Sequence, residues 1–247
     1  MIDQQIEIPT KDGHTTTFIT HPERGGPFPV IIFYMDAPAI REELRDMARR
    51  LGTSGYYVML PNLYYRAGVM EIGPIPPDPD APERKRMFDL MHSINIPLVM
   101  EDTSALLAYA DGQSAARTDI VGTVGYCMSG RYAINAATQF PDRVKAAASI
   151  YGVQLATDQP DSPHLAAQKT RAELYFACAE TDIYAPQDII DKVTQAMAGA
   201  NAEVEVYPGT HHGFAFPKRP VYDRDAAERH WERLLALYRR NLTPQGS

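Results

Sequence analysis

Cysteine is scarce in this sequence: only two of its 247 residues are cysteines, Cys127 and Cys178. Two cysteines are too few for a disulfide framework or for a cysteine-based zinc site. No apolar stretch approaches the ~18 residues that a membrane span needs. Residues 1–4 also lack the basic and apolar regions of a signal peptide. We therefore expect a cytoplasmic protein that does not bind membranes.

Positive charge is also in short supply. Lys and Arg total 24 against 31 Asp and Glu, the formal net charge is −7, and no sustained basic run offsets it. Nucleic-acid binding is therefore not expected. No His-x-x-x-His or clustered-carboxylate pattern predicts a metal, and no Gly-x-Gly-x-x-Gly or Gly-x-x-x-x-Gly-Lys predicts a nucleotide. We expect no metal and no cofactor, in a monomer or a small homo-oligomer.

Regular apolar patterning is abundant. Hydrophobic residues make up 45% and charged residues 22%, as in ordinary globular proteins. Alternating or continuous apolar runs predict strands over residues 2–8, 15–20, 28–34, 56–60, 119–125, 144–151, 172–179 and 202–207. Helical spacing predicts helices over residues 40–51, 129–139, 186–198 and 223–240, and a helical pattern before Ala110 that breaks at Pro97. This alternation predicts one α/β domain over residues 1–247, with a mostly parallel sheet covered by helices on both faces.

Residues 66–86 differ from the rest because seven residues of this segment are glycine or proline. Such a segment cannot be regular structure throughout. We interpret it as an excursion over the surface. A long loop of this kind is either a functional lid or a passive insertion.

The most informative short segment is residues 125–130, Gly-Tyr-Cys-Met-Ser-Gly, which ends one predicted strand and opens the next helix. A sharp strand-to-helix turn of this kind, usually written Gly-x-Ser-x-Gly, carries the nucleophile of α/β-hydrolases. Here Cys127 takes the nucleophile position, and Ser129 stands where the second glycine is usual. Cys127 is therefore a candidate nucleophile, although a lone cysteine is otherwise most often a small buried thiol.

Two later segments supply an acid and a histidine in the chain order that this fold needs. Asp182 follows one predicted strand and His212 follows the next, so both belong at the carboxyl edge of the sheet. A histidine base would activate the thiol, whose free pKa is about 8.5, and the acid would orient the imidazole. Glu180 and His211 are the neighbouring alternatives for these two roles.

The sequence resembles the dienelactone hydrolase family of α/β-hydrolases, in which cysteine replaces the usual serine. The resemblance runs over nearly the whole chain. It is carried by residues 28–32 (Phe-Pro-Val-Ile-Ile), 62–66 (Asn-Leu-Tyr-Tyr-Arg), the Cys127 turn, 151–153 (Tyr-Gly-Val), Asp182 and 212–214 (His-Gly-Phe). It implies the α/β-hydrolase fold and hydrolysis of a small enol-lactone or ester, of the dienelactone or carboxymethylenebutenolide type, through an acyl-cysteine intermediate.

The resemblance also implies roles for individual residues. The catalytic triad of the family falls on Cys127, Asp182 and His212. The two backbone N–H groups of its oxyanion hole fall on Met128 and Ala37.

Two further positions of the family match in part. An acidic residue beside the cysteine falls on Asp36, where the family normally has Glu, and a carboxylate-binding arginine falls on Arg66. The second substrate arginine of the family falls on Phe216, which cannot bind a carboxylate. Lys218 or Arg219 would have to replace it from nearby.

Plainer alternatives remain for several of these residues. Asp36 is either an active-site acid or a cap for the following helix, and Arg66 is either an anion-binding or a solvated arginine. Tyr151 either lines the pocket or packs beside the Cys127 turn. Cys178 lies beside the apolar run 174–177, so we interpret it as a core residue.

Three functions follow, in order of preference. The preferred function is hydrolysis of an enol-lactone. An enol-lactone has a good leaving group, which suits a thiol nucleophile whose thioester must then be hydrolysed. A general carboxylesterase or thioesterase on the same scaffold is the alternative, and Phe216 favours it. A thiol-bearing binding protein without catalysis is the third.

Overall fold

The computed structural model describes residues 1–243, and the chain divides into two compact units that meet at residues 118 and 119. The first unit contains four strands in the order β1-β2-β4-β3. β1 pairs antiparallel with β2, and β2 with β4, whereas β3 and β4 are parallel. The strands are β1 (Ile2–Thr10), β2 (Gly13–His21), β3 (Phe28–Tyr34) and β4 (Tyr57–Pro61).

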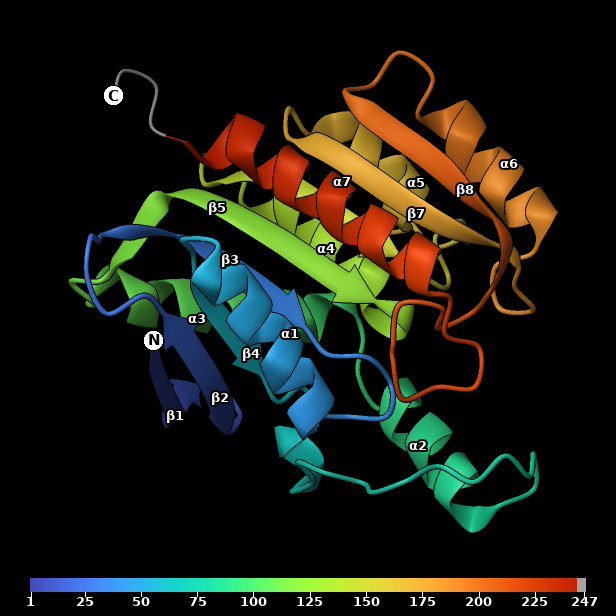
Figure 1. The fold of residues 1–247 in the computed structure, drawn as a ribbon, viewed down its shortest axis with the longest axis horizontal. Helices are drawn as coiled ribbons and strands as arrows, with labels where there is room; N and C mark the ends of the chain where they lie inside the picture. Colours follow the sequence, from blue (N-terminus) through green and yellow to red (C-terminus); the bar gives the residue numbers. More distant parts are fainter. Residues whose placement is uncertain (244–247) are drawn as a thin grey trace. The chain divides into compact units, whose positions relative to one another are not determined.

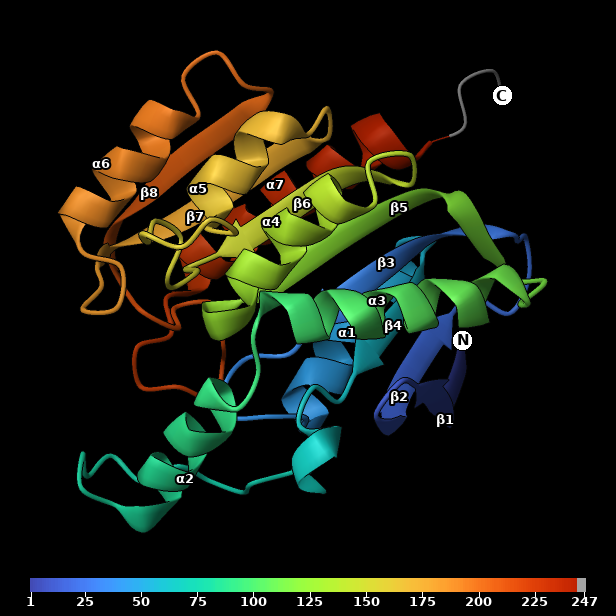
Figure 2. The same ribbon diagram turned by 180° about the vertical axis from the view of Figure 1, so that it is seen from behind.

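Helices cover both faces of the strands of the first unit. α1 lies on one face in Figure 1, and α3 lies on the other face in Figure 2. The short helix η1 and the helix α2 belong to the segment between β4 and α3. The bounds are α1 (Glu42–Thr53), η1 (Tyr65–Ala67), α2 (Pro82–His92) and α3 (Ile96–Asp111).

The second unit contains four strands in the order β5-β6-β7-β8, and every neighbouring pair is parallel. Helices α4, α5 and α6 lie on one face of these strands and α7 on the other (Figures 1 and 2). The bounds are β5 (Ala116–Tyr126), η2 (Cys127–Ser129), α4 (Gly130–Gln139), β6 (Val144–Ile150), α5 (Pro163–Ala166), η3 (Ala167–Lys169), β7 (Glu173–Thr181), α6 (Gln187–Ala196), β8 (Ala202–His211) and α7 (Arg224–Leu242).

This arrangement confirms the predicted α/β class with mostly parallel strands. Apolar runs account for it, because strands buried on both faces need apolar side chains at every position. Val30, Ile31 and Ile32 in β3 are fully buried, as are Ala146 and Ala147 in β6. The prediction of a single domain over residues 1–247 stays a prediction.

Most element boundaries differ from the sequence prediction by one to three residues, and two differences have a clear physical reason. The helical break does not fall at Pro97, because proline is tolerated in the first turn, where its missing N–H has no helical partner. The break falls at residues 93–95, and Asn95 caps α3 by accepting a hydrogen bond from the Leu98 N–H at 3.0 Å. The predicted strand over 202–207 continues to His211, because Thr181 pairs with His211 beyond a bulge.

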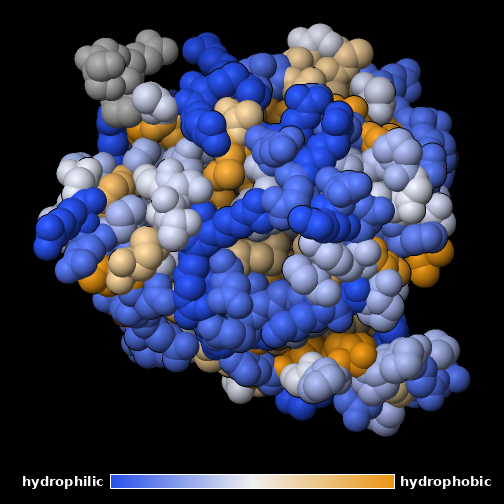
Figure 3. Space-filling view, in the orientation of Figure 1, coloured by the Kyte–Doolittle hydropathy of each residue, from blue (hydrophilic) through white to orange (hydrophobic). Residues whose placement is uncertain are grey.

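The proline-rich excursion is partly regular. α2 begins at Pro82, inside the segment that the sequence marks as irregular, because Pro82 again occupies a first helical turn. The surface view in Figure 3 shows mostly hydrophilic residues, with apolar residues in small groups. No helix within residues 1–243 combines the length and the apolar character needed to cross a membrane.

Candidate active site

Cys127 lies on a tight turn between β5 and α4. Its φ angle is +56°, a left-handed conformation that a side chain adopts only at a cost of roughly 1–2 kcal/mol. Cys127 opens the short helix η2, and its side chain is partly exposed. The turn therefore presents the thiol at the carboxyl end of β5, as expected of a nucleophile turn.

Two glycines make this turn possible, because neither position has room for a side chain. A Cβ atom on Gly125 would lie 2.0 Å from the Ser129 carbonyl oxygen, and one on Gly130 would lie 2.2 Å from Oγ of Ser149. The sequence places serine where the second glycine of the motif is usual. The close approach to β6 occurs one residue later, at Gly130, so Ser129 is accommodated.

His212 joins Cys127 and Asp182. Its Nδ1 atom lies 2.7 Å from Oδ2 of Asp182, and its imidazole interacts electrostatically with the Cys127 thiol. The side chain of His212 is 11% exposed and that of Asp182 is 1% exposed. Asp182 directly follows β7 and His212 directly follows β8, so two neighbouring strands bring the acid and the base together.

The charge state of His212 follows from these contacts. Burial by itself lowers the pKa of the imidazole. The negative charge of the Cys127 thiolate and the hydrogen bonds to Asp182 and Cys127 act in the opposite direction, and the resulting pKa is about 10. His212 is therefore an imidazolium at neutral pH when Cys127 is a thiolate, which is the ion pair that thiol nucleophiles use.

Glu180 and His211, the alternatives for the acid and the base, do not make the contact that joins Asp182 to His212. Oε2 of Glu180 accepts a hydrogen bond from the Gly209 N–H, and His211 is exposed within β8. Cys178 is 4% exposed, and burial raises the pKa of its thiol to about 12, with a further rise from Asp182. These contacts favour Asp182, His212 and Cys127 over their neighbours.

Aromatic rings surround His212. Tyr151 and Tyr184 present their rings edge to face against the imidazole, with centroids 5.1 and 4.9 Å away. Tyr151 is buried, whereas Tyr184 is 41% exposed. Sequence reasoning named Tyr151 but missed Tyr184, although its place two residues after Asp182 was a usable signal.

Phe216 belongs to the same apolar cluster. Its ring contacts those of Tyr151 and Tyr126, and it is fully buried. The guanidinium of Arg219 lies over the ring of Phe216, 5.2 Å from its centroid. Arg219 thus lies beside the position where the family has its second substrate arginine.

The two charged residues predicted in the first unit, Asp36 and Arg66, have defined partners within that unit. Asp36 is fully buried and accepts two hydrogen bonds from the guanidinium of Arg41, at 2.6 and 3.1 Å. It does not cap α1, which begins after Arg41 without a side-chain cap. Sequence reasoning missed Arg41, because no pattern marked it as the partner of a buried acid.

Arg66 is held by two carboxylates of the chain. It donates to both oxygens of Asp102, at 2.8 and 2.9 Å, and to Asp12 at 2.8 Å. Its guanidinium also lies over the ring of Tyr65. The plane of donors that would bind a substrate carboxylate thus already binds Asp102, and only the resemblance supports the substrate role.

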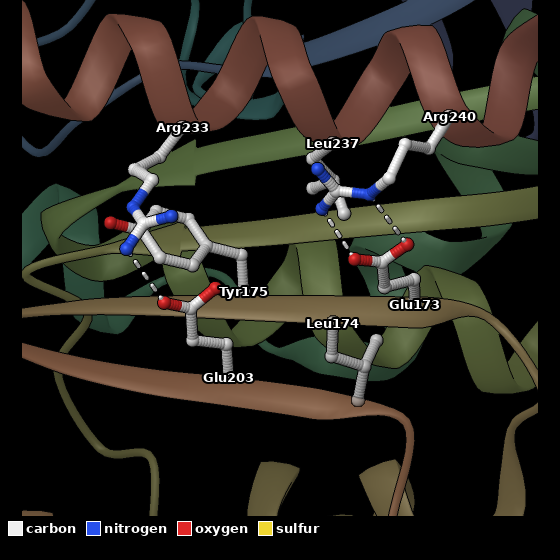
Figure 4. A pocket seen from close by; sticks show the side chains of 7 residues that line it. All are labelled: Glu173, Leu174, Tyr175, Glu203, Arg233, Leu237 and Arg240. Carbon is white, nitrogen blue, oxygen red and sulfur yellow. Dashed lines mark hydrogen bonds and ion pairs between the residues drawn. The ribbon is translucent and has the colours of Figure 1, made fainter.

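The structure also has a small cavity that lies outside the candidate triad. A cavity of about 20 Å³ lies beneath α7, and the ion pairs Arg240–Glu173 and Arg233–Glu203 cross it (Figure 4). It has room for about one water molecule.

Across residues 1–243 no three His, Cys, Asp or Glu side chains are grouped as metal ligands would be.

Comparison with known proteins identifies the family of the chain. The model of the dienelactone hydrolase family matches residues 15–242. The chain belongs to the dienelactone hydrolase family. Because members of this family are esterase-type hydrolases, the chain is a hydrolase.

Individual relatives cover almost the whole chain. A protein of Methylorubrum extorquens, provisionally named carboxymethylenebutenolidase, is 30% identical over 97% of this chain and 81% of its own length. A Bradyrhizobium protein, provisionally named 2-oxo-3-(5-oxofuran-2-ylidene)propanoate lactonase, is 23% identical over 96% of this chain and 94% of its own. A crystal structure from Klebsiella pneumoniae, of a protein provisionally named dienelactone hydrolase, superposes with a TM-score of 0.84 at 25% identity and covers 96% of this chain and 98% of that one.

Proposed function

We propose that this dienelactone hydrolase family member cleaves a small ester or lactone through an acyl-cysteine intermediate. Cys127 is the nucleophile, His212 the proton carrier and Asp182 the group that orients the imidazole. The observation that carries the proposal is the position of His212, which is hydrogen-bonded to Asp182 and interacts electrostatically with Cys127. A thiolate, an imidazole and a carboxylate in this order form a complete nucleophilic system.

The reaction has two halves. The Cys127 thiolate attacks the carbonyl carbon, and the π electron pair of the carbonyl moves to its oxygen. When the adduct collapses, the C–O bond breaks and the leaving oxygen takes the proton of the His212 imidazolium. A water molecule then attacks the thioester, gives a proton to His212, and the thiolate leaves with its electron pair as the acid forms.

The negative oxygen of each adduct needs hydrogen-bond donors. The backbone N–H groups of Met128 and Ala37 are the donors that the family resemblance implies. Met128 follows the nucleophile and Ala37 lies in the loop after β3, where α/β-hydrolases have their two donors. One such donor contributes about 3 kcal/mol to the stability of the transition state.

The proposed substrate is a small enol-lactone that bears a carboxylate. Two relatives carry names of enzymes that open unsaturated lactones. An enolate is a good leaving group, and a thiol nucleophile benefits from one. Arg66 and Asp36 are the residues that the resemblance assigns to substrate binding and to the thiol, and Tyr151 lines the site beside His212. The cytoplasmic location and the monomer or small homo-oligomer stay predictions from sequence.

A general carboxylesterase or thioesterase is the second candidate. The buried Phe216 favours it, because an apolar ring occupies the position of a carboxylate-binding arginine. A panel of lactones with and without a carboxylate, with neutral aryl esters and acyl thioesters, separates the two. A preference in kcat/KM for acidic lactones supports the first candidate, and a preference for neutral esters or thioesters supports the second.

The decisive experiment compares the two thiols. Cys127→Ala should abolish hydrolysis of every accepted ester, whereas Cys178→Ala, which removes a buried thiol of β7, should retain it. In the native protein iodoacetamide should modify Cys127 and leave Cys178 unmodified until the chain unfolds. A Cys127→Ala variant with full activity would refute the mechanism, and a native protein inactive on the whole panel would leave only a binding role.

A further inference from the structure

The loop between β3 and α1 contains a backbone N–H group that no acceptor in the described part of the chain binds. Ala37 is 3% exposed, and within residues 1–243 its N–H has no hydrogen-bond partner. Pro38 has no N–H, and the N–H of Ala39 donates to the carbonyl oxygen of Asp36 at 3.1 Å. A buried N–H without a partner in the chain is costly and rare in proteins, and this donor is available to an acceptor from outside the chain.

The peptide units on both sides of the Ala37 Cα atom are held by hydrogen bonds. The free N–H belongs to the Asp36–Ala37 peptide, whose carbonyl oxygen accepts from Ala39. The carbonyl oxygen of the next peptide, that of Ala37, accepts a hydrogen bond from Oη of Tyr64 at 3.0 Å. Because a peptide unit is planar, the Asp36 carbonyl sets the direction of this N–H, and holding the Ala37 carbonyl restrains rotation of the unit about the Ala37 Cα atom.

Tyr64 is itself firmly placed. It is 1% exposed, and its own N–H donates to Oδ1 of Asn62 at 3.0 Å. Nδ2 of Asn62 in turn donates to the Val69 carbonyl oxygen at 2.9 Å. The hydroxyl therefore reaches Ala37 from a turn that is fixed immediately after β4.

The other side of the loop is held as well. Arg41 binds Asp36 with two hydrogen bonds and donates a third to the Ala39 carbonyl oxygen at 3.2 Å. Ala39 has a φ angle of +68°, a conformation that alanine keeps only when its surroundings enforce it. The N–H of Ile40 donates to the Met70 carbonyl oxygen at 3.2 Å, which ties the start of the proline-rich excursion to the same loop.

We propose that Tyr64 is a positioning residue for the oxyanion hole: its hydroxyl holds the Ala37 carbonyl so that the Ala37 N–H keeps the direction that the oxyanion requires. The proposal rests on the proposed function, in which Ala37 supplies one of the two donors. The oxyanion exists only while the thiolate and the carbonyl carbon are bonded in the tetrahedral adduct. Loss of the Tyr64 hydroxyl should therefore slow acylation and leave substrate affinity unchanged.

The test is Tyr64→Phe, which keeps the ring and removes the hydroxyl. The burst of p-nitrophenol from p-nitrophenyl acetate gives the acylation rate constant and the substrate dissociation constant separately. We expect the rate constant to fall about tenfold, less than the roughly 10²–10³-fold fall when a donor itself is lost. The dissociation constant should change less than twofold.

Tyr238→Phe is the matched control, because the Tyr238 hydroxyl is also buried and also donates to a backbone carbonyl, that of Thr123 at 2.9 Å. It should lower the melting temperature by a similar amount and leave the acylation rate unchanged. A trifluoromethyl ketone, which forms a tetrahedral adduct with the thiol, should bind Tyr64→Phe about tenfold more weakly and the control equally well.

Two outcomes overturn the proposal in different ways. If wild-type acylation needs Cys127 but Tyr64→Phe acylates at the wild-type rate, or slows only as much as the control, Tyr64 has no positioning role. If Cys127→Ala retains its activity, the proposed function fails and the role of Tyr64 fails with it.

Discussion

Nδ1 of His212 and Oδ2 of Asp182 lie 2.7 Å apart although 30 residues separate them in the chain. This contact fixes the tautomer and the orientation of the imidazole, because the carboxylate accepts the Nδ1–H and leaves Nε2 for the thiol. It depends on β7 and β8 being neighbours, with Asp182 directly after one strand and His212 directly after the other.

Asp182→Asn should lower kcat roughly 10²–10⁴-fold while the protein stays folded, since an amide in place of the carboxylate no longer stabilises the imidazolium. Steady-state kinetics on p-nitrophenyl acetate measure the effect. Glu180→Gln is the control, because Glu180 bonds the Gly209 N–H and not His212. Equal losses in the two variants would contradict the assignment of Asp182.

His212 should keep its proton far above neutral pH. Its pKa in the folded protein is about 10, against an ordinary value of 6.5. Because the folded value is the higher one, the contribution of this proton to stability is complete below pH 6.5 and is lost as the pH rises through 10. A ¹⁵N-histidine NMR titration should place the midpoint near 10.

The same titration distinguishes the causes of this pKa. Cys127→Ala removes both the thiolate charge and one hydrogen bond that raise the pKa of His212, so the midpoint should move down, toward the ordinary value. An unchanged midpoint in Cys127→Ala would show that the thiolate does not interact with His212.

Arg66→Met should lower the free energy of unfolding by about 3 kcal/mol, because it leaves the buried carboxylate of Asp102 without its cation. Urea denaturation measures the change. Arg240→Met, which removes an exposed ion pair with Glu173, should cost less than about 1 kcal/mol. Unchanged stability in Arg66→Met, with a selective rise in KM for acidic lactones, would instead assign Arg66 to the substrate.

Gly125→Ala should prevent folding or destabilise the protein by more than about 4 kcal/mol, because the new Cβ would lie 2.0 Å from the Ser129 carbonyl oxygen. Soluble yield and thermal denaturation report the effect. Gly112→Ala is the control, since its Cβ would lie at an ordinary 3.5 Å from the Tyr109 carbonyl oxygen. A stable, active Gly125→Ala protein would contradict the tight turn described for Cys127.

Local patterns were sufficient for most of the fold. The strand over residues 28–34 is predicted to the residue, because a short continuous apolar run is typical of a strand buried on both faces. The extension of β8 to His211 was missed, because it depends on pairing with Thr181 and not on the local sequence. The helical break predicted at Pro97 was wrong because proline disrupts the interior of a helix but is tolerated in its first turn, where Pro97 lies.

The candidate triad was accessible from sequence because each member follows a strand in a recognisable segment. The contacts that hold the surrounding loops were not. Tyr64 reaches Ala37 across 27 residues and Arg66 reaches Asp102 across 36, and no spacing rule encodes either pair. Such contacts depend on how strands and loops are brought together, which a pattern of apolar residues does not specify.

Ile183, the residue after Asp182, leaves 83% of its surface in solvent. A side chain that buries so little adds almost nothing to the free energy of folding, so most replacements there are tolerated. Replacements at this position, next to the acid of the proposed triad, should therefore leave the stability of the scaffold unchanged.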